Sequence, residues 1–502
     1  MLIGSLRGAK PLFGNSSPSP LRERGIQGVR VITNPVKIAL PKGRLLDKTA
    51  VLLRRAGWGL DEYRETTRLY QVKSRRFPAL LIKVFHEKDI PVQVAIGNYD
   101  LGICGLDWIE ELLVKYPSSA LVKIKNLGYG DGALYMVAGR PGTVPATTQI
   151  KARHGVIRIA SEYPNLAESF ALRNRLSRFS IFPVWGGAEV YPPENADLAL
   201  IPGRTEAELY SYGMVPVTRV LNFAAFLIAN KSSWEKKNLG KVVASIGDNL
   251  PPEKEKPAPT DVITAAEMPV PEMDKDVVRI ALPDGHQQLP ALQLLNKAGI
   301  QIDDYPSAVG NRRPTVNLSG VVVKVIRPQD MPLQVANGNF DLAITGRDWL
   351  EEHLSQFPSS PVKEFLDLGF GWVKIVAVVS RTLSVTDVYS LRQLGTGRLV
   401  PLRVASEYVN IADKYARENH LGHYRVIPTW GASEAFLPDD ADLLIENTQT
   451  GRTIARHNLR IIDTLFESTA CLVGNTGIEF SSGKGKRIKS IIDTLRAAVE
   501  DI

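Results

Sequence analysis

The chain carries the same series of short motifs twice, and this repeat limits its possible folds more than any other feature. Residues 36–44 (VKIALPKGR) recur at 278–286 (VRIALPDGH), and residues 91–113 match 332–354 at 15 of 23 positions. The segments 159–163 and 185–189 recur in the same order at 404–408 and 430–434. We therefore expect two copies of one folding unit within the 502 residues.

The segment between the copies has the composition of a linker. Residues 248–276 contain six prolines and the charged run EKEK, which favour an extended, solvated chain over packed structure. We predict a first repeat over residues 36–247 and a second repeat over residues 277–502. Residues 1–35 lack the apolar stretch of a signal peptide, so we expect a disordered leader or an upstream translated extension there.

Short apolar runs alternate with helical patterns inside each repeat. In the first repeat, apolar runs at 36–40, 80–85 and 101–104 alternate with helical patterns at 45–56 and 108–115. This alternation predicts an α/β fold with a mostly parallel sheet covered by helices. Ligands of such sheets bind beyond the carboxyl ends of the strands, and the best-repeated motifs fall at those turns.

The charge of the chain favours phosphorylated small molecules as ligands. Lys and Arg outnumber Asp and Glu by 61 to 53, but the sequence has neither a long basic run nor an aromatic-basic nucleic-acid module. A basic surface without a special partner is the alternative. The only cysteines are Cys104 and Cys471, and no stretch approaches a membrane span. We expect a cytoplasmic protein that binds neither nucleic acid nor membrane.

The turn Lys42-Gly43-Arg44 follows the first predicted strand. Its glycine lets the backbone approach a ligand, and its two basic side chains supply fixed positive charge, which suits phosphate. A surface turn with incidental basic residues explains this motif equally well when it is taken alone.

The second repeat contains a more specific loop, 446–454 (ENTQTGRTI), directly after the apolar run 441–445. Hydroxyls at Thr448, Thr450 and Thr453, together with backbone N–H groups around Gly451, offer donors to one phosphate. The carboxylate of Glu446 can accept hydrogen bonds from ribose hydroxyls. A helix N-terminus capped by threonine is the alternative explanation.

Taken together, these motifs resemble those of the ATP phosphoribosyltransferase family. The strings IALPKGRL, DLGI, LGFG, ASEY, a Trp-Gly pair followed by Glu, and TGRTI occur in the order found in that family. The resemblance covers residues 36–247 and 277–500. It implies a tandem duplication of a two-lobed fold similar to type II periplasmic binding proteins, with a linker between the copies and an active site in the cleft between two lobes.

The resemblance also implies roles for individual residues. It assigns the 5-phosphate and ribose of phosphoribosyl pyrophosphate to the late loop, with Glu446 as a catalytic residue and with Thr448, Gln449, Thr450, Gly451, Arg452 and Thr453 as binding residues. It assigns the pyrophosphate and nucleotide to the basic turn, which makes Lys42 and Arg44 catalytic candidates. Nucleotide-binding roles are implied for Asp107, Asp348, Glu407 and Tyr408.

The implied reaction is displacement at C1 of the ribose by N1 of ATP, with release of pyrophosphate, in the first step of histidine synthesis. Mg²⁺ is the implied cofactor, and its ligands are unknown. Basic groups must neutralise the leaving group while the reactants are held in place, and no covalent nucleophile is required. Besides ATP and phosphoribosyl pyrophosphate, the resemblance implies a possible regulatory subunit resembling histidyl-tRNA synthetase, because the tail at 483–502 is too short for a regulatory domain.

The two repeats depart from the family pattern in complementary ways. In the first repeat, aligning Arg204-Thr205 with Arg452-Thr453 requires a loop three residues shorter, with Pro202 in place of Thr450 and without the acidic residue. In the second repeat, Asp284 and His286 replace Lys42 and Arg44. We therefore expect an intrachain pseudo-dimer with productive chemistry at the loop around Thr450, in which repeat one supplies structure, regulation or basic groups.

Several candidate residues also have structural explanations. Asp107 and Asp348 could cap helices, Glu162 and Glu407 could favour helix dipoles, and Trp185 and Trp430 are expected in the core rather than as adenine platforms. Two other functions compete with the enzyme: a small-molecule binding module, and a family member that has lost catalysis and senses nucleotide or phosphoribosyl pyrophosphate.

Overall fold

The computed structural model describes residues 35–60, 62–64, 70–139, 155–250, 276–308, 310–396, 398–431 and 433–500. The predicted leader lies outside these ranges except for Pro35, and most of the predicted linker also lies outside them. Both therefore remain predictions. Across the described ranges, none of the helices combines the length and the apolar character needed to cross a membrane.

The first lobe of repeat one is built on a six-stranded sheet with the strand order β2-β3-β1-β4-β11-β5. Its elements are β1 (Lys37–Lys42), α1 (Leu46–Arg55), β2 (Gln71–Val72), β3 (Leu81–His86), α2 (Asp89–Ala95), β4 (Leu101–Gly105), α3 (Leu106–Lys115), β5 (Leu121–Asn126), β11 (Ala225–Asn230), α7 (Lys231–Lys236) and α8 (Gly240–Gly247). Helix α1 buries Leu46, Thr49, Leu52 and Leu53, whose spacing places them on one helical face.

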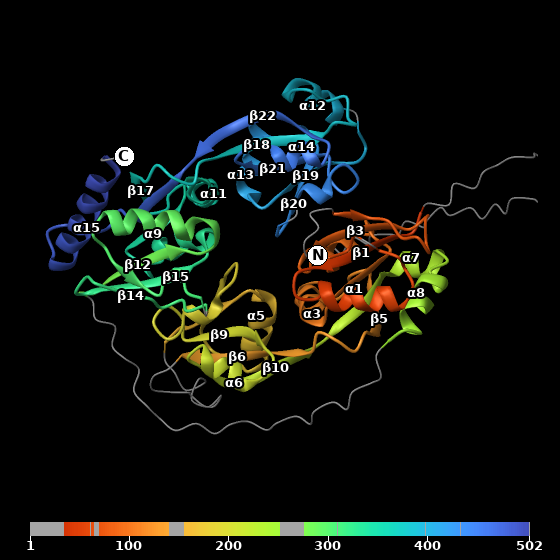
Figure 1. Cartoon of the computed structure of the whole chain (residues 1–502), viewed down its shortest axis with the longest axis horizontal. Helices are drawn as coiled ribbons and strands as arrows, with labels where there is room; N and C mark the ends of the chain where they lie inside the picture. The colour runs from red at the N-terminus through yellow and green to blue at the C-terminus, as the bar shows by residue number, and fades with distance from the viewer. Residues whose placement is uncertain are drawn as a thin grey trace, which may run out of the picture. The chain divides into compact units, whose positions relative to one another are not determined.

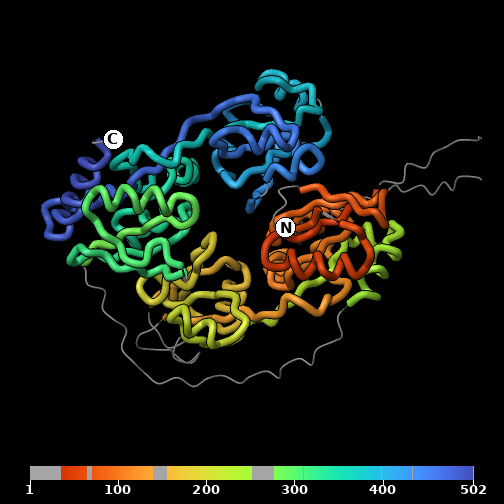
Figure 2. Tube along the Cα trace, in the orientation of Figure 1, coloured from red at the N-terminus to blue at the C-terminus, as the bar shows by residue number. Residues whose placement is uncertain are grey.

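The second lobe of repeat one has a five-stranded sheet with the order β10-β6-β9-β7-β8. Its elements are β6 (Gly132–Gly139), β7 (Ile157–Ser161), α5 (Pro164–Arg173), β8 (Phe179–Pro183), the 3₁₀ turn η1 (Ala188–Val190), β9 (Leu198–Gly203), α6 (Glu206–Ser211) and β10 (Met214–Phe223). The chain then returns to the first lobe, where Trp58 Nε1 donates to Ser245 Oγ of α8 at 3.0 Å. Figure 2 shows this yellow-green segment beside the red start of the lobe.

The first lobe of repeat two has the sheet order β15-β12-β16-β23-β17 and a separate pair, β13-β14. Its elements are β12 (Val278–Pro283), η2 (Gly285–Gln287), α9 (Gln288–Lys297), β13 (Ile302–Asp303), β14 (Thr315–Val316), β15 (Val321–Ile326), η3 (Pro328–Asp330), α10 (Met331–Ala336), β16 (Leu342–Gly346), α11 (Arg347–Gln356), β17 (Val362–Asp367), β23 (Ala470–Asn475) and α15 (Gly483–Glu500). The terminal helix α15 packs beside α9 (Figure 1).

The second lobe of repeat two has the order β20-β19-β21-β18-β22, which matches its counterpart in repeat one read in reverse. Its elements are β18 (Val373–Ser380), α12 (Val388–Gly395), β19 (Leu402–Ser406), α13 (Val409–Glu418), β20 (Tyr424–Pro428), η4 (Ser433–Phe436), β21 (Leu443–Thr448), α14 (Arg452–Arg456) and β22 (Leu459–Ser468). The two repeats thus share one strand order in each lobe, except that β2 extends the first sheet of repeat one.

The sheets are mixed, whereas the sequence predicted mostly parallel ones. Strand β1 pairs in parallel with β3 and β4, but β11 is antiparallel to both β4 and β5. Parallel neighbours are reached through crossover helices. Strand β11 instead enters the sheet on the return path from the second lobe, so it runs in the opposite direction.

Two of the hydrophobic cores contain residues from both repeats. One combines the second lobe of repeat one, including Tyr191 and Leu209, with the first lobe of repeat two, including Met331 and Phe340. The other combines the first lobe of repeat one with the second lobe of repeat two, where Phe85 and Phe436 meet edge to face at 5.2 Å. Each lobe therefore buries apolar surface against the opposite lobe of the other repeat.

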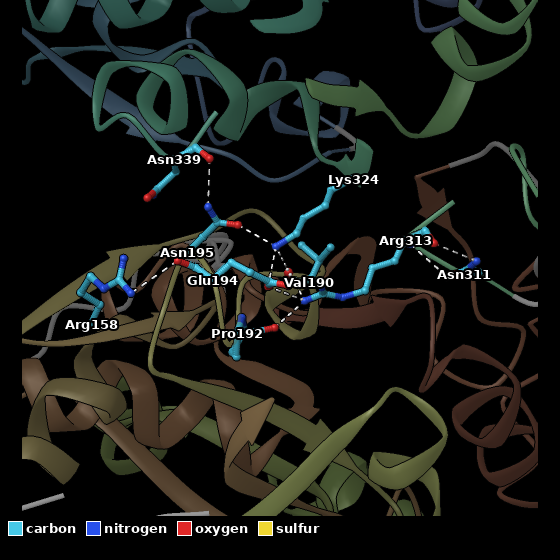
Figure 3. A network of polar contacts seen from close by, with 9 residues as sticks. All are labelled: Arg158, Val190, Pro192, Glu194, Asn195, Asn311, Arg313, Lys324 and Asn339. Carbon is cyan, nitrogen blue, oxygen red and sulfur yellow. Dashed lines mark hydrogen bonds and ion pairs between the residues drawn. The ribbon is translucent and has the colours of Figure 1, made fainter. Parts of the chain in front are cut away.

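Buried polar contacts accompany the first of these shared cores (Figure 3). Lys324 Nζ of repeat two donates to Val190 O at 3.1 Å, Glu194 Oε2 at 2.9 Å and Asn195 Oδ1 at 2.7 Å. Asn195 in turn donates to Asn339 O at 3.0 Å. Because a buried ammonium group must be paired to be tolerated, these contacts fix how this pair of lobes fits together.

A related contact accompanies the second shared core, with different residues. Lys83 Nζ of repeat one donates to Ala435 O at 3.0 Å and to Asp440 Oδ2 at 3.1 Å. Tyr99 OH donates to the same Asp440 oxygen at 2.9 Å. Lys83 and Lys324 occupy equivalent positions in β3 and β15, so the repeats contact each other reciprocally.

Candidate active site

A pocket of about 320 Å³ lies in the cleft of repeat two. The first lobe contributes Asp284, Gly285, His286, Gln287, Arg327, Pro328, Gln329, Asp348 and Trp349 to its lining, the second lobe contributes Val373, Glu407, Tyr408 and Asn447, and Gly371 lies in the segment that joins the lobes. Most of these residues come from the turns after β12, β15, β16 and β19, which is where open α/β sheets bind ligands. Three predicted site residues, Asp348, Glu407 and Tyr408, therefore share one pocket.

Tyr408 links the two lobes of repeat two across this pocket. Its hydroxyl donates to Asp348 Oδ2 at 2.6 Å and accepts from Asn447 Nδ2 at 2.9 Å. Ser468 Oγ donates to the other Asp348 oxygen at 3.0 Å. Asp348 lies inside the first turn of α11, whose N-cap is Gly346. It is therefore not the helix cap that the sequence allowed, and its carboxylate joins α11 to the second lobe.

Glu446 lies within β21 (Leu443–Thr448), beside two other carboxylates. Ser433 Oγ donates to its Oε2 in a short hydrogen bond, and the backbone N–H of Asn447 donates to Oε1 at 3.0 Å. Burial and the charges of Glu407 and Glu434 raise the pKa of Glu446 well above its ordinary value. Burial and the charge of Glu434 also raise the pKa of Glu407, to about 7. This group of carboxylates favours hydrogen-bond donors or positive charge nearby.

The loop after Glu446 is exposed and turns at a glycine. Gly451 has φ +67°, a left-handed conformation that side chains disfavour, and its N–H donates to Thr448 Oγ1 at 3.0 Å. Gln449, Thr450, Arg452 and Thr453 are exposed. The threonine hydroxyls and backbone donors of this loop thus remain accessible to a ligand.

The equivalent cleft of repeat one is crossed by ionic contacts. Arg44 Nη2 donates to Asp107 Oδ2 at 2.6 Å, and Arg44 Nε donates to Glu87 Oε2 at 3.0 Å. Tyr163 OH of the second lobe donates to Asp107 at 2.9 Å. A further ion pair joins Lys88 of the first lobe to Glu162 of the second at 2.9 Å. Arg44, a catalytic candidate, and Asp107, a nucleotide-binding candidate, therefore bind each other.

Asp284 does not leave a bare negative charge at the first turn of repeat two. Its carboxylate forms ion pairs with Arg312 at 3.2 Å and with Arg327 at 3.1 Å. Arg312 also pairs with Glu189 of repeat one at 3.1 Å. The positive charge that Lys42 and Arg44 supply in repeat one is thus supplied in repeat two by arginines from the segment before β14 and the turn after β15, and Arg327 itself lines the pocket.

The late loops of the two repeats have equal length, which corrects the predicted three-residue difference. Gly203 and Thr448 pair with equivalent positions of β6 and β18, and the next strands begin with the equivalent residues Met214 and Leu459. The true counterpart of Thr450 is Thr205. The likeness of Arg204-Thr205 to Arg452-Thr453 had shifted the alignment by three residues.

In this register, the loop of repeat one differs from that of repeat two at the proposed ligand-binding positions. Glu206 and Glu208 stand where Gly451 and Thr453 stand in repeat two, and Ile201 stands where Glu446 does. The carboxylate of Glu208 accepts from Arg204 N at 2.7 Å, and Thr205 Oγ1 accepts from Glu208 N at 3.3 Å. Acidic side chains therefore occupy the loop of repeat one and repel a phosphate.

Lys42 is connected to the second repeat by the stacked rings of Tyr70 and His457. Its ammonium group lies 5.5 Å from the centre of the Tyr70 ring. Tyr70 stacks on His457, the C-cap residue of α14, with ring centres 5.0 Å apart. Lys42 is exposed. Through Tyr70, this basic side chain of repeat one lies close to α14, the helix that follows the loop of repeat two.

Sequence reasoning missed several members of the cleft. Glu434 and Ser433 belong to the repeated Trp-Gly motif, and its glutamate could have been nominated because both copies keep it. Asn447 and Arg327 carried no repeated signal, since Pro202 and His86 stand at their positions in repeat one. Trp185 and Trp430, predicted in the core, are both half-buried, and Trp185 packs against the core cluster around Trp349.

Comparison with known proteins gives a consistent result. The sequence profile of the family described as ATP phosphoribosyltransferase matches residues 86–249 and 327–497, more than half of the chain. The ATP phosphoribosyltransferase of Saccharolobus solfataricus is 33 % identical over 233 residues, covering 44 % of this chain and 72 % of that protein. The enzyme of the same name from Chlorobium phaeobacteroides is 31 % identical over 235 residues, covering 45 % and 72 %.

Among solved structures, the chain is similar to an ATP phosphoribosyl transferase (HisG:HisZ) complex from Thermotoga maritima, with 21 % identity and a TM-score of 0.37 over 45 % of this chain and 100 % of that one. The family profile matches both repeats, and each relative named above covers about the length of one repeat. On these sequence matches, the chain belongs to the ATP phosphoribosyltransferase family.

Proposed function

We propose that the chain transfers the phosphoribosyl group of phosphoribosyl pyrophosphate to N1 of ATP, releasing pyrophosphate, as the first step of histidine biosynthesis. Family membership supports this reaction. We further propose that one site per chain, in the cleft of repeat two, carries the reaction. The observation behind this second part is the loop at 446–453, in which Glu446, Gly451 and Thr453 have the counterparts Ile201, Glu206 and Glu208 in repeat one.

The chain is proposed to be a tandem duplication of one two-lobed unit, similar to type II periplasmic binding proteins. The matching strand orders and the repeated motifs support it. The reciprocal cores and the contacts of Lys83 and Lys324 support an intrachain pseudo-dimer. The proposed boundaries remain residues 36–247 and 277–502, with the segment 248–276 between them.

In the proposed site, the loop of repeat two binds the 5-phosphate and Glu446 binds the ribose. Hydroxyls of Thr448, Thr450 and Thr453 and the backbone around Gly451 donate to the phosphate oxygens. The carboxylate of Glu446 accepts hydrogen bonds from ribose hydroxyls. The nucleotide would occupy the pocket lined by Asp348, Glu407 and Tyr408, which orients N1 of adenine toward C1 of the ribose.

Charge at the leaving group is the main electrostatic demand of this reaction. Pyrophosphate gains negative charge as its bond to C1 breaks, and fixed positive groups stabilise that charge most in a site that excludes water. Arg327 lines the pocket of repeat two and supplies one such group. Lys42 is proposed to supply a second from repeat one, because its side chain lies on the ring pair Tyr70–His457 beside α14.

Mg²⁺ remains a proposed cofactor without a protein cage in the ranges that the structure describes. No group of three or more His, Cys, Asp or Glu side chains in those ranges is arranged to hold a metal ion. The roles proposed for the side chains of the loop and the pocket do not depend on the metal. A regulatory subunit resembling histidyl-tRNA synthetase and a cytoplasmic location are likewise proposals, which rest on the family resemblance and on the sequence.

The direct test is turnover by the purified full-length chain with ATP, phosphoribosyl pyrophosphate and Mg²⁺, followed by the near-ultraviolet absorbance of N1-substituted ATP. The chain should form product, and the double variant Thr450→Ala with Thr453→Ala should form almost none. Binding of phosphoribosyl pyrophosphate without turnover would instead favour a sensor.

The basic turn of repeat one is tested in the same assay. Lys42→Ala should lower turnover, whereas Arg44→Ala should change it little because Arg44 binds Glu87 and Asp107 in its own cleft.

A further inference from the structure

A tryptophan of repeat one packs behind the pocket of repeat two. Trp185 lies in the turn after β8, and its ring meets that of Trp349 with centres 5.6 Å apart at an angle of 59°. Trp349 lines the pocket and stacks on Tyr408, with ring centres 4.4 Å apart. In the described ranges, the hydrophobic cluster around Trp349 and Tyr408 takes only Trp185 from repeat one.

Trp185 is held in place through its backbone as well as through its ring. Its N–H donates to Asp330 Oδ1 and Oδ2, each at 3.1 Å. Asp330 is 4 % exposed and follows Pro328 and Gln329, which line the pocket. Repeat two therefore holds both the backbone and the ring of Trp185. A movement of this turn in repeat one would shift the pocket lining through Asp330 and through Trp349.

The contact continues from Trp349 to the loop of repeat two. Tyr408, stacked on Trp349, bonds to Asp348 at 2.6 Å and to Asn447 at 2.9 Å. Asn447 directly follows Glu446 and precedes Thr448. The packing of Trp349 thus sets the position of the Tyr408 hydroxyl, and that hydroxyl holds the residue from which the loop departs.

The described ranges show no equivalent ring contact at the other junction of the repeats. Trp108 stacks on Tyr163 at 4.2 Å, as Trp349 stacks on Tyr408, but the ammonium group of Lys88 lies 4.7 Å from the centre of the Trp108 ring. The counterpart of Lys88 in repeat two is Gln329. Within the described ranges, Trp430 makes no ring contact of the kind that Trp185 makes. In the described ranges, the backbone of Trp430 contacts Asp89 of repeat one as that of Trp185 contacts Asp330, but only Trp185 adds a ring contact to the cleft of the other repeat.

We infer that Trp185 is a positioning residue for the site in repeat two: it holds Trp349 and Tyr408 so that Asn447 and the following loop are ordered before substrate binds. The identity of the ligand that the loop binds rests on the proposed function. The inference that Trp185 orders the loop is independent of that function. Losing one aromatic contact of this kind changes an equilibrium by roughly two- to tenfold. If the ordered loop is the state that binds, the apparent affinity for the ligand falls in proportion to the population of that ordered state.

The test compares Trp185→Ala, Trp185→Phe and Trp185→Leu with Trp234→Ala, a control at an exposed tryptophan of α7 in the same repeat. Hydrogen exchange of the backbone amides at 446–457 is measured first, because it reports loop order without turnover. Trp185→Ala should speed this exchange and raise KM for phosphoribosyl pyrophosphate about two- to tenfold, with a smaller change in kcat. Trp185→Phe should restore both, and Trp234→Ala should change neither.

Unchanged exchange and unchanged KM in folded Trp185→Ala would overturn the inference. If Trp185→Ala does not fold, the Leu and Phe variants are compared instead, because both fill the space of the ring and only Phe keeps an aromatic ring. Equal hydrogen exchange of the loop in these two variants would also overturn the inference. An inactive wild-type chain would remove the proposed function alone. The exchange measurement would still decide whether Trp185 orders the loop.

Discussion

Glu407 ionises close to neutral pH, because burial and the charge of Glu434 raise its pKa to about 7. The carboxylate form accepts hydrogen bonds from ligand hydroxyls through both oxygens, whereas the protonated form presents a donor on one of them. We therefore expect kcat/KM for ATP to rise as the pH passes through about 7, and Glu407→Gln to lose this rise. A pH profile of kcat/KM for the wild type and the variant checks this.

The same ionisation affects stability, with the opposite sign. A carboxyl group whose pKa is raised on folding stabilises the protein below its unfolded pKa, and this contribution is lost as the pH rises through the folded pKa. The free energy of unfolding should therefore fall between pH 4.5 and about 7 less steeply in Glu407→Gln than in the wild type. Equal slopes from urea titrations at several pH values would mean that Glu407 is not perturbed.

At the scale of elements, the sequence predicted most turns of the fold but not the pairing of its strands. The strands ending at Lys42 and Gly105 and helices α1 and α3 lie within a few residues of their predicted positions, because apolar periodicity and glycine turns act locally. The antiparallel return strands β11 and β23 depend on contacts distant in sequence, so the predicted sheets were too parallel.

The candidate site was predictable to the extent that its residues sit in repeated motifs. Asp348, Glu407 and Tyr408 do, and the structure gathers them in one pocket. Arg327 and Asn447 do not, and their place follows from the packing of the lobes. Similar dipeptides misled the alignment of the late loop, since Arg204-Thr205 resembles Arg452-Thr453 while strand pairing equates Thr205 with Thr450.

The corrected register makes a prediction at the two late loops. Thr205 caps α6 by accepting from Glu208 N, so Thr205→Ala should lower the free energy of unfolding by about 1 kcal/mol and leave turnover unchanged. Thr450→Ala should have the reverse profile, with turnover reduced at least about tenfold, as expected for one lost hydrogen bond to a charged group. Thermal unfolding and the absorbance assay separate the two. Lost turnover in Thr205→Ala would place function in repeat one.

At the scale of the whole molecule, buried lysines join the repeats. Lys324 is 6 % exposed and pairs with Glu194, which is 37 % exposed. Although burial opposes it, hydrogen bonds from Arg313 and the charge of Lys324 lower the pKa of Glu194 to about 2. Two reciprocal junctions of this kind explain why the shared cores form between lobes of different repeats.

Removing Lys324 should destabilise the whole chain. Lys324→Met leaves Asn195 and Val190 O without their donor and should lower the free energy of unfolding by about 2 kcal/mol, less than for a fully buried ion pair because Glu194 is partly solvated. Urea unfolding of the full-length chain measures this. Lys123→Met is the matched control, because its ion pair with Glu110 is exposed and should contribute less than about 1 kcal/mol. Equal losses would mean that the junction does not hold the repeats together.

In the proposed function, one site per chain, in repeat two, binds phosphoribosyl pyrophosphate. Titration calorimetry of the full-length chain with phosphoribosyl pyrophosphate and Mg²⁺ measures the number of sites directly. We expect one site per chain, lost in Thr450→Ala with Thr453→Ala and kept in Thr205→Ala. Two sites per chain, or binding that survives the double variant, would contradict the claim.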